Sequence, residues 1–215
     1  MLLLARHGQT AAALAQYDKC RQILADELGV EPSATTNALY ERLLLARDRL
    51  PIPLPDDGTR FVGRKRELAF LLEQIARPDC RLMTIVGLGG MGKTRLALAA
   101  ARSVAQQETI LFLNGVAFVS LEGVASKNGL LTALLSALGA APKPGSLPDQ
   151  VLANLRSREL LLVLDNFEEL LGEVATISQI VAKCPDVTLL VTSREALGIS
   201  AEHRLDLDGL AAPTS

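Results

Sequence analysis

The sequence predicts an α/β protein, with a parallel sheet flanked by helices and a small all-α segment ahead of it. Three observations lead to this prediction. Short apolar runs alternate with longer helical patterns from about residue 60 onward, which is the order of a parallel sheet with right-handed crossover helices. The run 160–164 is apolar at every position, as a central strand covered on both faces requires. A glycine-rich segment, residues 87–92, separates the first run from a strongly helical stretch.

The first 50 residues are predicted to be helical. A helix end is stopped by Gly8, and Thr10 is the expected cap of a second helix that runs to about residue 28. Pro32 with Ser33 starts a third helix, through about residue 49. The apolar stripe of the second helix has five large and three small members: Leu14, Tyr17, Ile23, Leu24, Leu28, Ala12, Ala13 and Cys20. This pattern is similar to the second half of a tetratricopeptide (TPR) unit, although an unrelated amphipathic hairpin would give the same spacing.

A linker is expected between the helices and the rest of the chain. Proline stands at every second position from residue 51 to 55, and acidic residues follow. Such a segment is extended, so residues 51–59 are predicted to join a helical domain, residues 1–50, to a larger domain, residues 60–215.

The elements of the larger domain follow from apolar runs, helical periodicity and turn residues. Predicted helices cover residues 65–76, 93–106 and 130–138, and a fourth begins at Pro148 with Asp149 after a loop at 140–148. Predicted strands cover residues 82–86, 116–121, 160–165, 187–191 and 203–207. Residues 110–113 are also apolar and are the alternative to the second strand.

The segment after the first strand matches the P-loop pattern of nucleotide-binding proteins. It reads Gly87-Leu88-Gly89-Gly90-Met91-Gly92-Lys93-Thr94. Glycines let main-chain N–H groups turn around a β-phosphate, Lys93 supplies a charge for the β- and γ-phosphate oxygens, and Thr94 offers a hydroxyl to Mg²⁺. The start of the following helix adds further N–H groups and the positive end of its dipole. A bound ATP or ADP is therefore predicted.

A dinucleotide-binding Rossmann site is the remote alternative, because Gly87, Gly89 and Gly92 also satisfy its fingerprint. That fingerprint has no use for a lysine and a hydroxyl directly after the third glycine. It also expects an acidic residue about twenty positions further on, where residues 111–113 are apolar.

The second half of a P-loop site is a buried strand that ends in an acid, and residues 160–165 supply this Walker B pattern. Asp165 is predicted to complete the Mg²⁺ shell begun by Thr94. The alternative is that this carboxylate only caps the next helix.

The residues after Asp165 bear on hydrolysis. Asn166 stands where many ATPases have a glutamate, and an amide cannot act as a base. Glu168 and Glu169 are the remaining candidates to orient the attacking water. The alternative is that both only lie in the first turn of a helix, where their negative charges are stabilised by the helix dipole. Fast turnover is therefore not expected. Arg194, after the strand at 187–191, is the candidate sensor of the γ-phosphate, because a guanidinium pairs with oxygens that vanish on hydrolysis. A surface arginine paired with Glu195 is the alternative.

Four segments together resemble the signal-transduction ATPases with numerous domains (STAND), the class that includes NB-ARC proteins. They are residues 61–64, the P-loop, residues 162–166 and residues 191–195. More specifically, the chain resembles bacterial regulators of the SARP/AfsR type, in which a helical activator domain precedes an AAA+-like ATPase; residues 24–33 are similar to the end of that domain. The resemblance implies that the Val-Gly-Arg segment packs on adenine. The predicted nucleotide contacts are Val62, Gly63, Arg64, Gly87, Gly89, Gly90, Met91, Gly92, Lys93, Thr94 and Arg95.

The chain departs from this family at both ends. The activator domain of the family normally begins before the residue aligned with Met1, and helical and winged-helix subdomains normally close the nucleotide pocket after the fifth strand. We therefore expect a chain that is truncated at both ends. Protein partners are expected at the helical segment, and a nucleotide-dependent oligomer is a further prediction.

Composition excludes several other classes. Of 215 residues, 22 are basic and 24 acidic, and residues 1–50 carry six of each, so direct binding of nucleic acid by this chain is not expected. Cys20, Cys80 and Cys184 are too widely spaced for a metal cluster or a disulfide framework. We expect a cytoplasmic protein without a membrane segment.

Two classes of function remain open. In the first, the chain is a slow ATPase that acts as a nucleotide switch in a transcriptional regulator. In the second, it binds ADP or ATP as a structural ligand and does not hydrolyse it. A switch must bind its ligand with different affinities in two conformations, whereas a structural site needs only one.

Overall fold

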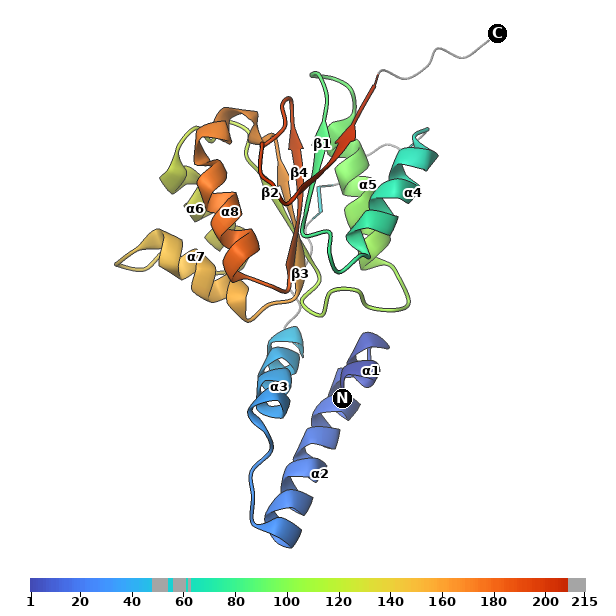
Figure 1. Cartoon of the computed structure of the whole chain (residues 1–215), viewed down its shortest axis with the longest axis vertical. Helices are drawn as coiled ribbons and strands as arrows, with labels where there is room; N and C mark the ends of the chain where they lie inside the picture. The colour runs from blue at the N-terminus through green and yellow to red at the C-terminus, as the bar shows by residue number, and fades with distance from the viewer. Residues whose placement is uncertain (48–53, 56–60, 62, 209–215) are drawn as a thin grey trace.

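The computed structural model describes residues 1–47, 54–55, 61 and 63–208. Within them, one five-stranded parallel sheet has the order β2-β3-β4-β1-β5. The strands are β1 (Leu82–Val86), β2 (Val116–Ser120), β3 (Leu160–Asp165), β4 (Val187–Ser193) and β5 (Glu202–Asp206). The predicted α/β class and the parallel sheet are confirmed. Since all strands are parallel, their carboxyl ends lie at the same end of the sheet (Figure 1). The glycine loop after β1, Asp165 at the end of β3 and Arg194 after β4 are therefore at this end.

The strand order excludes the dinucleotide-binding alternative. A Rossmann sheet places its second strand next to the first, so that an acid at the end of that strand reaches the ribose. Here β3 and β4 lie between β1 and β2. The position of β4 between the glycine-loop strand and the Walker B strand is the arrangement of a P-loop NTPase, which the sequence predicted.

Helices cover both faces of the sheet (Figure 1). One face is covered by α4 (Lys65–Ile75) and α5 (Lys93–Ala105). The opposite face is covered by α6 (Lys127–Ala137), α7 (Leu147–Arg156) and α8 (Val174–Lys183), and the 3₁₀ helix η1 (Phe167–Glu173) precedes α8. Strand β3 shows why its run is apolar throughout. Leu160, Leu162 and Leu164 pack in one core with α6 to α8, and Leu161 and Val163 pack in the other with α4 and α5.

Two helices of the larger domain begin earlier than the sequence predicted, because serine side chains cap them. The Ser126 hydroxyl accepts a hydrogen bond from the Gly129 N–H at 3.2 Å and starts α6. The Ser146 hydroxyl accepts from the Asp149 N–H at 3.4 Å and starts α7. A capping side chain satisfies one of the free N–H groups of a first helical turn, and this fixed both boundaries.

The N-terminal segment consists of α1 (Leu2–Arg6), α2 (Thr10–Leu28) and α3 (Ala34–Arg47). The predicted Thr10 cap is wrong, because Thr10 is already helical and α2 has no side-chain cap. Tyr17 of α2 makes two contacts with α3. Its ring stacks on the Tyr40 ring, with the ring centroids 3.9 Å apart, and its hydroxyl donates to the Asn37 side-chain oxygen at 2.8 Å. The C-terminal half of the predicted stripe is wrong, since Ile23 and Leu28 are exposed.

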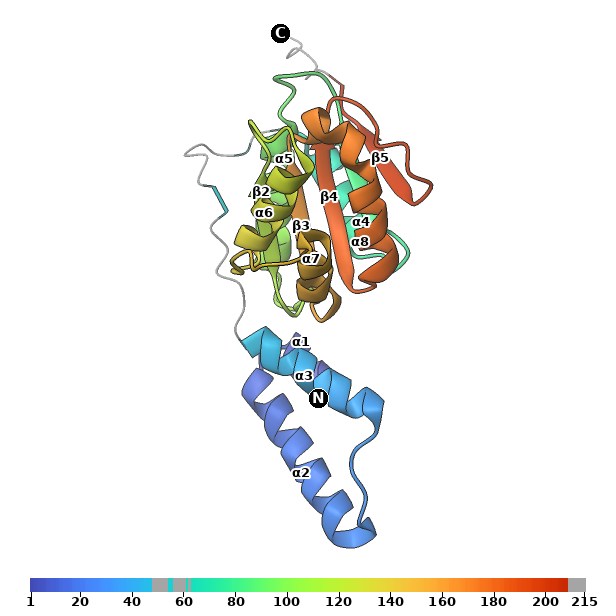
Figure 2. The same cartoon turned by 90° about the vertical axis from the view of Figure 1, so that its left-hand side faces the viewer.

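These helices dock at the end of the sheet opposite the glycine loop (Figure 2). A small core joins the helices to Leu113 of the larger domain; its helical members are Ala5, Ala13, Leu43 and Ala46. The alternative strand at 110–113 is therefore wrong: the Ile110 N–H donates to the Arg6 carbonyl at 2.8 Å instead of to a strand. The linker prediction, 51–59, falls mostly outside the described residues. No described helix is both long and apolar enough to cross a lipid bilayer.

Candidate functional site

A pocket of about 320 Å³ lies at the carboxyl edge of the sheet, within the usual size range of small-molecule sites. Its lining residues come from three strand ends: Gly89, Gly90, Gly92, Lys93, Thr94, Arg95, Asn166, Glu168 and Arg194. Nine residues predicted or discussed from the sequence thus meet around one hollow. Three of them are cationic, which suits a polyphosphate.

The glycine loop has the backbone that the pattern predicts. Gly90 and Gly92 have φ angles of 78° and 83°, in the left-handed region that other residues avoid. Gly87 meets a different restriction, since a Cβ there would lie 2.9 Å from the Leu207 carbonyl oxygen. The loop can therefore approach the end of β5 only with glycine at this position.

We expect Gly87→Ala to lower the free energy of unfolding by about 1–3 kcal/mol, because the added methyl group forces the loop and the backbone after β5 apart. Gly172→Ala is the matched control, since a Cβ at Gly172 meets no atom within 4 Å. It should be neutral or stabilise by about 0.4–1 kcal/mol. Urea unfolding followed by circular dichroism measures both, and equal midpoints would contradict the steric argument.

Lys93 is the first residue of α5 and is buried, with 7% of its surface exposed. Its ammonium group donates to the carbonyls of Gly87 at 2.7 Å and of Leu88 at 3.0 Å. The side chain thus curls back over the loop, and its charge lies where the loop N–H groups and the α5 dipole already favour an anion.

Thr94 and Asp165 are in direct contact across the sheet edge. The Thr94 hydroxyl lies 2.9 Å from each carboxylate oxygen of Asp165. Hydroxyl and carboxylate oxygens are the hard ligands that Mg²⁺ prefers, so the donor set fits this ion. The alternative that Asp165 caps a helix finds no support, because η1 has Asn166 as its N-cap residue without a side-chain hydrogen bond.

Thr192 is a site residue that the sequence analysis missed. Its hydroxyl donates to Asp165 at 2.6 Å and accepts from the Asn166 N–H at 3.0 Å, so it fixes the carboxylate and the turn after it. The predicted strand stopped at Val191, whereas β4 runs to Ser193. The sequence shows a polar residue directly after the apolar run, but it does not show that β4 lies next to β3, which brings Thr192 to Asp165.

Glu168 and Glu169 have different surroundings. Asn166 takes a left-handed φ of 60° and turns the chain into η1. Glu168 then lines the pocket and accepts from Arg194 Nε at 3.1 Å, while its other oxygen is buried without a partner among the described residues. Glu169 is exposed and lines only a neighbouring hollow.

Arg194 follows β4 directly and is 63% exposed on its side chain. Its ion pair is with Glu168 rather than with Glu195, the partner considered from the sequence. Because the pair is exposed on the arginine side, it is weak and can exchange for other partners.

The expected adenine segment is only partly described. Val62 lies outside the described residues. Gly63 and Arg64 have positive φ angles, and the Arg64 guanidinium donates to the carbonyls of Met91 at 3.1 Å and Asp208 at 2.7 Å. Arg64 therefore ties this segment to the glycine loop, but neither residue lines the pocket. Their contact with adenine stays a prediction.

The three cysteines are free thiols. Burial raises the pKa of the Cys80 and Cys184 thiols, so both stay protonated near neutral pH. The described residues contain no group of three or more His, Cys, Asp or Glu side chains that could hold a metal ion.

Two family models match the chain. The model of the bacterial transcriptional activator domain matches residues 1–44, and that of the AAA ATPase domain matches residues 60–191. The matched ranges agree with the two parts described above.

Three curated relatives are similar to the chain. The regulatory protein AfsR of Streptomyces griseus is 31% identical over 236 residues, which covers 97% of this chain and 23% of that protein. AfsR of Streptomyces coelicolor is also 31% identical, over 98% of this chain and 24% of its own length. An uncharacterized protein of Mycobacterium tuberculosis is 37% identical over 146 residues, covering 67% of this chain and 36% of the relative. The chain thus spans about a quarter of the AfsR proteins.

Among solved structures, a STAND protein with a tetratricopeptide repeat sensor from Pyrococcus horikoshii aligns with 70% of this chain and 24% of its own. The TM-score is 0.49 and the identity 19%.

Proposed function

Since the chain belongs to the AAA ATPase domain family, carries a bacterial transcriptional activator domain at its N-terminus and is homologous to AfsR-type regulators, we propose that it is a nucleotide switch. In this proposal it binds ATP or ADP with Mg²⁺, hydrolyses ATP slowly, and is the ATPase module of a cytoplasmic transcriptional regulator. Its helical segment relays the nucleotide state to protein partners.

The contact between Thr94 and Asp165 carries the proposal. A hydroxyl from the first turn of α5 and a carboxylate from the end of β3 meet beside a buried lysine and a loop of main-chain N–H groups. This arrangement supports Lys93 as the phosphate-binding charge and Thr94 with Asp165 as the Mg²⁺ ligands. Mg²⁺ bound there would neutralise charge on the phosphate oxygens.

For hydrolysis, the geometry favours Glu168 over Glu169. Glu168 lines the pocket, one of its oxygens is held by Arg194 and the other has no partner among the described residues, whereas Glu169 does not line the pocket. Arg194 would sense the γ-phosphate, because its donors can pair with oxygens that only the triphosphate carries. Since Arg194 now pairs with Glu168, sensing and water positioning would be linked.

The second candidate is a binding module without turnover. The observation that favours it is Asn166, which lines the pocket directly after the Walker B aspartate with an amide side chain that cannot act as a base. Both candidates share the nucleotide site and differ only in the role of Glu168.

Two measurements on the purified chain test the proposal. Isothermal titration with ADP and ATP should show one site that depends on Mg²⁺, and no binding of either nucleotide would reject the site. Phosphate release should fall by about 10²-fold or more in Glu168→Gln, as expected for a residue that positions water, with little change in ATP affinity. Glu169→Gln is the matched control and should keep turnover. No phosphate release by the wild-type chain would favour the binding module, and equal turnover in both variants would contradict the role of Glu168.

A further inference from the structure

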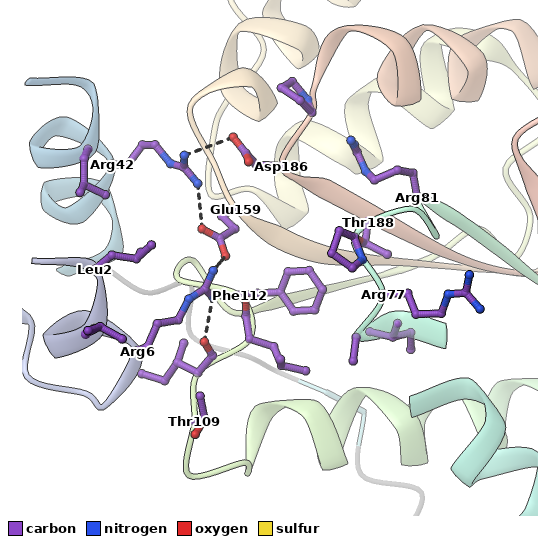
Figure 3. A pocket seen from close by; sticks show the side chains of 18 of the residues that line it. Leu2, Arg6, Arg42, Arg77, Arg81, Thr109, Phe112, Glu159, Asp186 and Thr188 are labelled. Atoms are coloured by element: carbon purple, nitrogen blue, oxygen red, sulfur yellow. Dashed lines mark hydrogen bonds and ion pairs between the residues drawn. The ribbon is translucent and has the colours of Figure 1, made fainter. Parts of the chain in front are cut away.

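A second and larger hollow, which we call the seam pocket, lies between the N-terminal helices and the base of the sheet (Figure 3). Its volume is about 660 Å³. It lies at the junction of the two matched domains, with walls from α1 and α3 on one side and from the segment 109–112, the end of α4 and the start of β4 on the other. Pockets of this size at domain junctions commonly bind small molecules.

Much of the wall is apolar. Leu39 of α3 and Ile75 of α4 line the pocket together with Phe112, which Figure 3 shows. An apolar wall alone would suit many ligands, so the polar groups must define the chemistry.

The polar part of the wall is cationic, with four arginines, Arg6, Arg42, Arg77 and Arg81, against the two carboxylates of Glu159 and Asp186. Both carboxylates are already in use. Glu159 pairs with Arg6 and, at 2.8 Å, with Arg42; Asp186 pairs with Arg42 at 3.4 Å.

Two of the guanidinium groups keep donors to spare. Arg42 Nε is buried and has no partner among the described residues. Arg81 donates to the carbonyls of Val187 and Cys184, and within the described chain it has no ion pair with a carboxylate. Burial lowers the pKa of Arg81, and the negative charge of Asp186 opposes this effect without forming an ion pair with Arg81.

Thr188 of β4 adds a third unused group. The residue is 7% exposed and lines the pocket, and its hydroxyl makes no hydrogen bond with the described residues. The hydroxyl oxygen is not among the buried atoms without a partner, so a ligand or water in the pocket can reach it.

We propose that the seam pocket binds a small amphipathic anion, with its oxyanion group at Arg81 and Thr188 on the sheet side and its apolar body against Phe112, Leu39 and Ile75, while Arg42 adds positive charge from the helix side. The pocket exists only while the helices are docked, because they supply one of its walls. A ligand that binds only the docked arrangement stabilises it by mass action. The seam pocket is thus a place where a small molecule controls the position of the helical segment independently of the nucleotide.

Two fluorescent dyes with the same aromatic body test this proposal on the full chain. 8-Anilinonaphthalene-1-sulfonate carries an anionic group, and N-phenyl-1-naphthylamine does not. The wild-type chain should bind the sulfonate at one site, more tightly than the neutral dye. Arg81→Met should weaken the sulfonate at least about tenfold, the effect of losing one charge-assisted hydrogen bond, and leave the neutral dye unchanged.

Two further variants separate the pocket from ordinary apolar surface. Ala76 lines the pocket and is exposed, so Ala76→Phe fills the hollow without disturbing a core and should weaken both dyes. Leu28→Ser removes an exposed apolar side chain outside the pocket and should change neither.

Three outcomes would overturn the proposal: no sulfonate binding by the wild-type chain, unchanged sulfonate binding in Ala76→Phe, or an equal loss of both dyes in a folded Arg81→Met. If Arg81→Met does not fold, as judged by far-ultraviolet circular dichroism, Ala76→Phe decides alone. Ala76 and Arg81 line the seam pocket and not the pocket at the glycine loop, so the effect of these two variants is separate from any dye bound at the nucleotide site.

Discussion

Lys93→Ala is expected to weaken Mg-ATP binding by about 2–5 kcal/mol, which corresponds to roughly 30-fold to several thousandfold in the dissociation constant. The physical reason is that the ammonium group is buried in the loop, 2.7 Å from the Gly87 carbonyl, and that a phosphate would be left there without its positive partner. The two carbonyls that lose their donor lie at the surface of the loop, where water can replace it. The fold should therefore survive.

Lys127→Ala is the matched control for Lys93→Ala. Lys127 is likewise the first residue of a helix, α6, but it is exposed and lines none of the pockets described above. Isothermal titration gives the affinity, and far-ultraviolet circular dichroism checks the helix content. Wild-type affinity in Lys93→Ala would remove the phosphate site from its present position.

Glu159→Gln is expected to release the N-terminal helices from the sheet, at a cost of about 3–5 kcal/mol, the usual effect of removing one member of a buried ion pair. Glu159 is 8% exposed and pairs with Arg6 of α1 and Arg42 of α3. Its own backbone is fixed by Asn114, whose side chain accepts from the Glu159 N–H at 2.8 Å. Two guanidinium groups would lose their shared carboxylate.

Hydrogen exchange measures this release. Amides of α1 to α3 should exchange faster in Glu159→Gln, while those of β3 and β4 keep their protection. Asp186→Asn is the control, because Asp186 pairs with Arg42 alone, at 3.4 Å, and is 37% exposed on its side chain. Its effect should be much smaller. Unchanged exchange in α1 to α3 of Glu159→Gln would show that the apolar core around Leu43 and Leu113 holds the helices by itself.

Glu159 also connects the two ends of the molecule. It directly precedes β3, the strand that ends in Asp165. The ion pairs with the helical segment and the contact with Thr94 thus lie at opposite ends of one fully buried strand. A shift of β3 along its axis would affect both, which gives the proposed relay a physical route.

The sequence predicted the sheet well because each strand carries a local signal. The residues of β3 are apolar on both faces, which few other structures require, and β1 and β3 have the predicted bounds. Local signals failed where two readings had the same pattern. Residues 110–113 are as apolar as a strand, but Ile110 and Leu113 pack against the helical segment, about a hundred positions away, and the two residues between them pack in the core with α4 and α5.

Helix boundaries failed for a different reason. Thr10 has the residue type of a cap without the capping geometry, whereas Ser126 and Ser146 have both. A cap depends on the φ and ψ angles before the helix as well as on the side chain. The C-terminal half of the α2 stripe is exposed for a related reason. The periodicity of apolar residues predicts which side of a helix is apolar, but not which element packs against it.

The sequence by itself determined the glycine loop with its lysine and threonine, and the buried strand that ends in Asp165. Those features depend on residues next to one another, because a left-handed turn needs glycine and a covered strand needs apolar side chains on both faces. Only the tertiary structure placed β4 between β1 and β3, and with it the Thr192 hydroxyl on Asp165. Only the tertiary structure set Glu168 apart from Glu169 and brought Arg42 to Glu159, 117 positions away. Such contacts follow from strand order and helix docking, which the spacing of residues along a chain does not encode.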